Sequence, residues 1–149
     1  MKKSQRIKAL VDINAAQEKN ALEVIAGVQN KLLAAQAQID HLKEYRQEYQ
    51  EKFDHLGSGG VKIAQLLEFR SFIDKLDKAI LGQEQASTAI EQELVAKRKL
   101  WENLHYRTNS LQKVCDAAGL AELKLQDKRE QLEQDERAAR SGRSSFMDG

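Results

Sequence analysis

The spacing of apolar residues constrains this chain more than any other feature of its sequence. Between residues 7 and 56, steps of three and four residues alternate without a break over seven heptads, and twelve of the fifteen positions are apolar. The positions are Ile7, Val11, Asn14, Glu18, Ala21, Ile25, Val28, Leu32, Ala35, Ile39, Leu42, Arg46, Tyr49, Phe53 and Leu56. An alternation sustained this long is typical of a coiled-coil seam rather than of the broader apolar stripe of a globular helix.

A second seam follows the only glycine cluster of the sequence, at residues 57–60. The same alternation runs from Leu66 to Ala118 and thins out between Glu122 and Glu136, with fourteen of its twenty-one positions apolar. A glycine cluster between two helical patterns is typical of a chain reversal. We therefore predict an all-α fold in which two long helices form an antiparallel coiled-coil hairpin. The 149 residues contain no proline, which suits long uninterrupted helices.

The two seams also predict a register. First and fourth core positions of opposite helices face each other when paired residue numbers add to 122. This register sets Val28 beside Leu94, Leu32 beside Ile90 and Phe53 beside Phe69, and it brings Lys31 near Glu93 and Lys43 near Asp77. Residue 1 then lies opposite residue 121, so the second helix is expected to overhang. We expect a single domain with helices over about 4–56 and 66–140, a turn at 57–65, and a disordered tail at 141–149.

Composition argues against several classes of protein. Twenty-four basic and twenty-three acidic residues give a net charge of +1, which does not favour nucleic-acid binding. Polar residues interrupt the N-terminal segment, so we expect neither a signal peptide nor direct membrane insertion, and we predict a cytoplasmic protein. The lone Cys115 lies at a seam position, where a buried apolar role is expected. His41, His55 and His105 are far apart and are expected to be solvated, so we predict no metal site, no cofactor and no enzymatic activity.

Two aromatic residues remain once the seams are assigned. Tyr45 and Phe72, with Ala79, fall on one flank of the predicted helix pair, beside seam residues. Exposed aromatic groups on a thin helical pair form an apolar patch that water disfavours. They either thicken the two-stranded core or bind a partner, and the pattern alone leaves both interpretations open.

The sequence around the turn resembles the flagellar FliJ family. EYRQEYQ at 44–50 places two tyrosines four residues apart before the turn, and EFRSFIDKLDKAI at 68–80 has the aromatic and aliphatic spacing of that family after it. Length, turn position and seams agree with the resemblance over essentially the whole chain. The resemblance implies a non-enzymatic component of flagellar type III protein export, required for flagellum biogenesis and motility. It implies a coiled-coil stalk that binds the export ATPase ring, the cytoplasmic domain of the export-gate membrane protein, and export chaperones.

The resemblance also implies binding residues. Those matched to the export-gate surface are Gln38, Leu42, Tyr45, Tyr49, Phe72, Leu76, Ala79 and Gln83, the last of which replaces a histidine common in the family. For the ATPase ring, the likeness to rotary-ATPase stalks points to the overhang, at Leu125, Arg129, Leu132, Arg137 and Arg140. Such a protein would associate peripherally with the export apparatus at the inner membrane. The alternatives are the equivalent stalk of a virulence-type secretion injectisome and a generic coiled-coil spacer.

Overall fold

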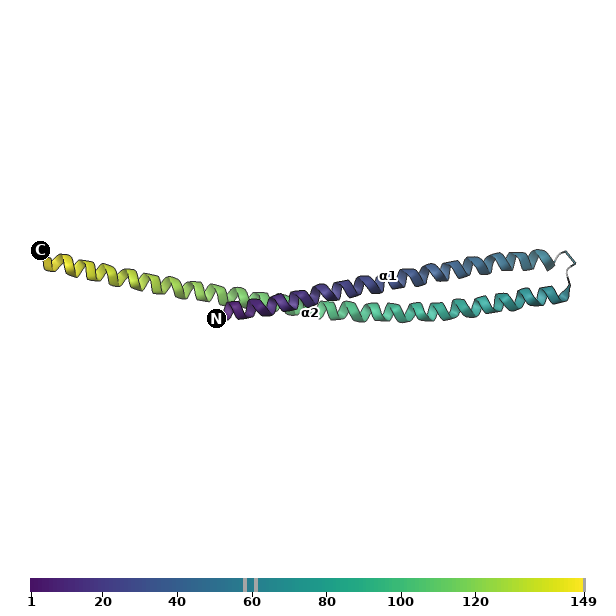
Figure 1. The fold of residues 1–149 in the computed structure, drawn as a ribbon, viewed down its shortest axis with the longest axis horizontal. Helices are drawn as coiled ribbons and strands as arrows, with labels where there is room; N and C mark the ends of the chain where they lie inside the picture. The colour runs from purple at the N-terminus through teal and green to yellow at the C-terminus, as the bar shows by residue number, and fades with distance from the viewer. Residues whose placement is uncertain (58, 61, 149) are drawn as a thin grey trace. The chain divides into compact units, whose positions relative to one another are not determined.

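A computed structural model describes the backbone of residues 1–57, 59–60 and 62–148, and the side chains of these residues up to 143. Its secondary structure consists of two helices, α1 at Lys3–Gly57 and α2 at Ile63–Asp148 (Figure 1). The two helices pack against each other as a hairpin. The predicted all-α fold is therefore confirmed.

Glycines make the turn between the helices. The N–H of Gly59 donates to the carbonyl oxygen of Leu56 at 3.1 Å, which satisfies one of the last carbonyl groups of α1. Gly60 has a φ of 72°, a left-handed conformation that costs residues with a Cβ about 1–2 kcal/mol. Lys62 then accepts hydrogen bonds from the first turn of α2. The reversal is thus shorter than the predicted turn at 57–65, because α2 begins at Ile63.

The far end of α2 differs from the expectation of a disordered tail. The helix does not end near residue 140 but continues to Asp148, and Gly149 lies outside the described residues. Extending an existing helix by one residue adds one hydrogen bond without a new nucleation cost, so small polar residues can continue a helix that they would not start. Poor packing potential, on which the expectation of disorder rests, does not decide whether a helix propagates.

The chain divides into two compact units, each of which contains part of both helices. The turn unit comprises Lys19–Glu102, and the terminal unit comprises Met1–Glu18 with Asn103–Gly149. In each unit a stretch of α1 pairs with a stretch of α2 that runs in the opposite direction.

Burial follows the predicted seams. All fifteen seam positions of α1 are buried or half-buried, and so are the seventeen of α2 from Leu66 to Glu122. The most deeply buried side chains are Val11, Asn14, Ile25, Val28, Ile39, Ile73, Leu76, Ile80, Ser87 and Leu94. Every residue from 123 to 143 is exposed. The prediction of a seam that loses its partner near residue 122 is confirmed.

Two polar residues of the terminal unit's seam, Asn14 and Thr108, bond within their own helices. Asn14 is only 7% exposed, and its amide nitrogen donates to the carbonyl oxygen of Leu10 at 2.9 Å. On α2, the Thr108 hydroxyl donates to the carbonyl oxygen of Leu104 at 2.8 Å. A buried polar group whose hydrogen bond is satisfied does not incur the full cost of desolvation, so these residues are tolerated in the seam.

Contacts in the turn unit agree with the predicted register at its centre. Ile25, Val28 and Leu94 form the buried cluster, against which Leu32, Ile90 and Trp101 pack. Lys31 lies 3.8 Å from Glu93, as expected.

The predicted pairing of Lys43 with Asp77 is wrong. Lys43 lies 3.4 Å from Glu84, and Asp77 binds Arg46 instead. Asp77 and Glu84 lie one heptad apart on α2. The flexible side chain of Lys43 therefore has an acidic side chain within reach in either direction along α2. Arg46, which lies at a nearby seam position of α1, pairs with Asp77 and leaves Glu84 for Lys43.

Candidate partner-binding surfaces

Four aromatic rings meet in the turn unit and form what we call the aromatic cluster: Tyr45, Tyr49, Phe69 and Phe72. Tyr49 is its centre, with ring centroids 4.5 Å from Phe72, 5.2 Å from Tyr45 and 5.8 Å from Phe69. Tyr45 also meets Phe72 edge-on at 6.3 Å. Tilted and edge-to-face pairs at these separations are favourable for aromatic rings and hold their orientations. The cluster therefore joins α1 to α2 and fixes the position of Tyr45.

Tyr45 is the exposed member of the aromatic cluster. Its side chain is 47% exposed, whereas Tyr49, Phe69 and Phe72 are half-buried. A hydrogen bond with Tyr49 is the main cause of a raised pKa of the Tyr45 hydroxyl. Tyr45 also borders a shallow groove of about 420 Å³, whose other lining residues are Gln38, His41 and Leu42. An oriented aromatic ring beside a groove is a favourable anchor for a partner.

The opposite side of the turn unit carries ion pairs. The guanidinium of Arg46 donates to both carboxylate oxygens of Asp77, and this pairing raises the pKa of Arg46. The stem of Arg46 is half-buried at a seam position and its head reaches an exposed acid, as expected for a long cationic side chain at a core edge.

In the terminal unit, a carboxylate of α2 caps the start of α1. The backbone N–H of Ser4 donates to Glu122 Oε1 at 3.0 Å, and its hydroxyl donates to Oε2 at 2.5 Å. These hydrogen bonds lower the pKa of Glu122. The first turn of α1 contains no acidic residue of its own, so Glu122 supplies the negative charge favoured at a helix N-terminus. Sequence reasoning treated Glu122 only as a weak seam position and missed this role.

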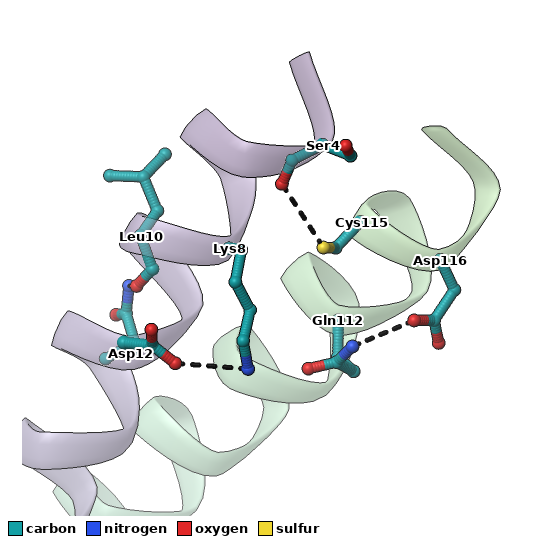
Figure 2. A network of polar contacts seen from close by, with 8 residues as sticks. Ser4, Lys8, Leu10, Asp12, Gln112, Cys115 and Asp116 are labelled. Atoms are coloured by element: carbon teal, nitrogen blue, oxygen red, sulfur yellow. Dashed lines mark hydrogen bonds and ion pairs between the residues drawn. The ribbon is translucent and has the colours of Figure 1, made fainter. Parts of the chain in front are cut away.

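Cys115 lies next to this cap. Figure 2 shows its thiol directed at Ser4, whose carbonyl oxygen accepts a hydrogen bond from the Cys115 Sγ at 3.5 Å. The thiol is half-buried, in line with its predicted seam position. Nearby, Lys8 pairs with Asp12 at 3.2 Å and Gln112 donates to Asp116 at 2.9 Å, each within its own helix (Figure 2). A shallow groove of about 670 Å³ is lined by Ser4, Gln5, Lys8, Cys115, Asp116, Gly119, Leu120 and Leu123.

One histidine does not have the solvated position that was expected. His105 Nδ1 lies 2.6 Å from Glu18 Oε1, and its other ring nitrogen lies 3.3 Å from the amide of Asn109. Glu18 stands in the seam with a side chain only 17% exposed. A half-buried carboxylate needs a hydrogen-bonding partner, and His105 provides it from the position beside the seam.

Residues 2–145 match the family described as Flagellar FliJ protein. The chain belongs to this family. Searches of curated proteins and of solved structures gave no match. Membership in the FliJ family makes this a flagellar export-related protein.

The residues matched to the FliJ export-gate surface differ in accessibility. Gln38, Tyr45 and Ala79 are exposed, whereas Leu42, Tyr49, Phe72 and Gln83 are half-buried. Leu76 is only 7% exposed and lies in the hairpin core. Its side chain can support the neighbouring surface but is not available to a partner docked on the intact hairpin.

The residues assigned to the ATPase surface all lie in the exposed stretch of α2. Leu125 is 52% and Leu132 is 63% exposed, and Arg129, Arg137 and Arg140 are also exposed. Spacings of four and three place Leu125, Arg129 and Leu132 on one stripe of the helix. This stripe continues the seam beyond the residues that α1 covers.

Two further surveys concern only the described residues. No helix there is long and apolar enough to cross a membrane. The same residues contain no group of three or more His, Cys, Asp or Glu side chains that could hold a metal ion.

Proposed function

We propose that this FliJ-family chain is a non-enzymatic coupling protein of flagellar export. In this proposal it binds the cytoplasmic domain of the export-gate membrane protein, binds the export ATPase ring, and receives export chaperones. It works in the cytoplasm, peripherally associated with the export apparatus at the inner membrane. The two main contacts use different parts of the chain: the aromatic cluster of the turn unit for the gate, and the exposed stretch of α2 for the ATPase.

The observation that carries the gate contact is the exposure of Tyr45. The seam of the turn unit is filled without it, yet two half-buried rings, Tyr49 and Phe72, hold its position. A side chain oriented in this way loses little conformational freedom when a partner covers it. This property favours a binding role over simple thickening of the core, and it also weighs against a passive spacer.

The gate contact can be tested with two matched tyrosine variants. Tyr45→Ala is expected to weaken binding of the purified gate domain at least tenfold in isothermal titration calorimetry, with little change in the melting of the hairpin. Tyr106 is also exposed, at 71%, but lies in the terminal unit, so Tyr106→Ala should bind within about twofold of the unmodified chain. Equal loss in both variants, or none in Tyr45→Ala, would refute the assignment.

The ATPase contact is best tested by removing the unpaired stretch of α2. The cut should follow Glu122, because that residue caps α1 and its loss would disturb the paired helices. Deleting residues 123–149 is expected to abolish stimulation of the purified export ATPase while leaving gate binding intact. The same loss should follow when Leu125 and Leu132 are both replaced by Gln in the full chain. Full stimulation by the shortened chain would exclude this surface.

A further inference from the structure

On α2, the two flanks of the turn unit differ sharply in charge. One flank consists of the residues that follow Phe69, Leu76, Gln83, Ile90 and Lys97, and all five are charged: Arg70, Asp77, Glu84, Glu91 and Arg98. The other flank consists of the residues that precede Ile73, Ile80, Ser87, Leu94 and Trp101, and only one of these five, Glu93, is charged; the others are Phe72, Ala79, Ala86 and Leu100. We call these the charged flank and the apolar flank.

Contacts between the helices confirm the two flanks. The pairs Arg46–Asp77 and Lys43–Glu84 cross the charged flank. The apolar flank is crossed by the ring contact of Tyr45 with Phe72 and by the pair Lys31–Glu93. On α1, the same flank consists of Val24, Lys31, Gln38, Tyr45 and Lys52.

A two-stranded coiled coil does not require an apolar flank. It buries the two seam positions of each heptad, whereas a helix of a larger bundle is also apolar at one flanking position. Here Val24 is 46%, Tyr45 is 47% and Leu100 is 52% exposed. These side chains follow the pattern of bundle-facing helices, although the hairpin alone leaves them in water.

We propose that a second copy of this chain covers the apolar flank of the turn unit, giving a four-helix bundle. The two hairpins lie side by side with their turns at the same end, related by a two-fold axis parallel to the helices. In this arrangement α1 of each copy lies against α2 of the other. Every neighbouring pair of helices is then antiparallel, which is the usual arrangement of four-helix bundles with short loops.

Charge complementarity favours a second copy in this orientation. Lys31 and Glu93 lie at the same level of the hairpin, 3.8 Å apart, and both remain accessible, with side chains 63% and 42% exposed. The two-fold axis brings Lys31 of each copy to Glu93 of the partner subunit. Val24 meets Leu100 of the partner subunit in the same way. The flank is therefore complementary to itself in both charge and apolarity.

The size of the flank predicts a reversible dimer. From Val24 to Tyr45 it spans twenty-two residues, or about 30 Å at the helical rise. With a width of about 15–20 Å, two copies would bury roughly 1,000–1,200 Å² in total, at the lower end of specific interfaces. We therefore expect association in the micromolar range. The dimer covers Tyr45, so, if the proposed gate contact also holds, self-association and gate binding compete.

Sedimentation equilibrium of the full chain over about 1–500 μM, with a reducing agent, tests this proposal without the gate domain. The unmodified chain should shift from monomer to dimer. Lys31→Glu, which sets acid against acid, and Glu93→Lys, which sets base against base, should each weaken the dimer at least tenfold. An equimolar mixture of the two variants should recover it to within about threefold, because only the mixed pair opposes unlike charges. Lys43→Glu, the same change on the charged flank, should dimerise normally.

Two results would overturn the proposal. The first is a monomer at every concentration. The second is a dimer that both charge variants leave unchanged, because such a dimer uses another surface. Neither result bears on the gate contact, which is measured separately with Tyr45→Ala. Conversely, normal gate binding by Tyr45→Ala would refute the gate contact and leave the dimer test intact.

Discussion

Helix α2 presents the same apolar spacing before and after Glu122, with opposite results. Leu94, in the paired part, is 7% exposed, whereas Leu132, at an equivalent seam position, is 63% exposed. The difference is the partner helix, because α1 begins at Lys3 and its first turn meets Glu122. A heptad pattern thus specifies which face of a helix can be buried. Whether that face is buried depends on where the opposite helix ends.

The largest expected effect separates these two parts of α2. Leu94→Ala removes a buried side chain that contacts the Ile25 and Val28 cluster, and should lower the free energy of unfolding by about 2–4 kcal/mol. Leu132→Ala should change it by less than about 0.5 kcal/mol. Urea unfolding followed by circular dichroism measures both. A comparable loss in Leu132→Ala would mean that the end of α2 is buried against something in the isolated protein.

A smaller effect of opposite sign comes from helical glycines. Gly27 lies in paired α1 and Gly142 in the unpaired end of α2, and a Cβ added at either meets nothing within 4 Å. Gly27→Ala should therefore stabilise the hairpin by about 0.5–1 kcal/mol. Gly142→Ala should increase the helical signal at low temperature without moving the main unfolding midpoint. If Gly142→Ala moved that midpoint as much as Gly27→Ala, the two parts of the chain would unfold together.

The smallest expected effect concerns the boundary between the two parts, at the exposed edge of the seam. The lowered pKa of Glu122 means that its hydrogen bonds with Ser4 add stability above the ordinary value of 4.5, and that this contribution is lost as the pH falls through the lower folded value. Glu122→Gln should lower the melting temperature slightly at pH 7 and flatten its dependence on pH below 4.5. Glu130→Gln, in the unpaired part, is the control. An unchanged pH profile in Glu122→Gln would show that the cap does not stabilise α1.

The seam could be predicted from the sequence because its period is repeated many times. The three polar residues at seam positions of α1, Asn14, Glu18 and Arg46, are too few to hide the pattern. The exposure of Tyr45 could be predicted for the same reason, since it is a large apolar side chain outside the seam. The ring contacts of Tyr49 could not. Aromatic side chains reach diagonal neighbours across a helix pair, and the register alone does not say which of Phe69 and Phe72 they meet.

Contacts that depend on a single geometry were missed. The register places the start of α1 near Glu122, but the cap also requires the backbone N–H and hydroxyl of Ser4 to point at the Glu122 carboxylate, which the register does not specify. The partner of Lys43 depends on rotamers of a long side chain between Asp77 and Glu84. The pairing of His105 with Glu18 follows from the register, which sets Glu18 opposite Leu104, whereas the spacing of histidines along the chain does not show which residues they meet on the opposite helix.

Asn14 and Thr108 have a consequence for the mechanical behaviour of the terminal unit. Each donates its hydrogen bond to a carbonyl group of its own helix, to Leu10 and Leu104 respectively. A polar pair bonded across the seam would have to break before one helix could slide along the other. Here the bonds travel with their helices, so a small axial slip at this level breaks none of them. Resistance to shear in the terminal unit must therefore come from the interlocking of apolar side chains and from the ties between Glu18 and His105 and between Ser4 and Glu122.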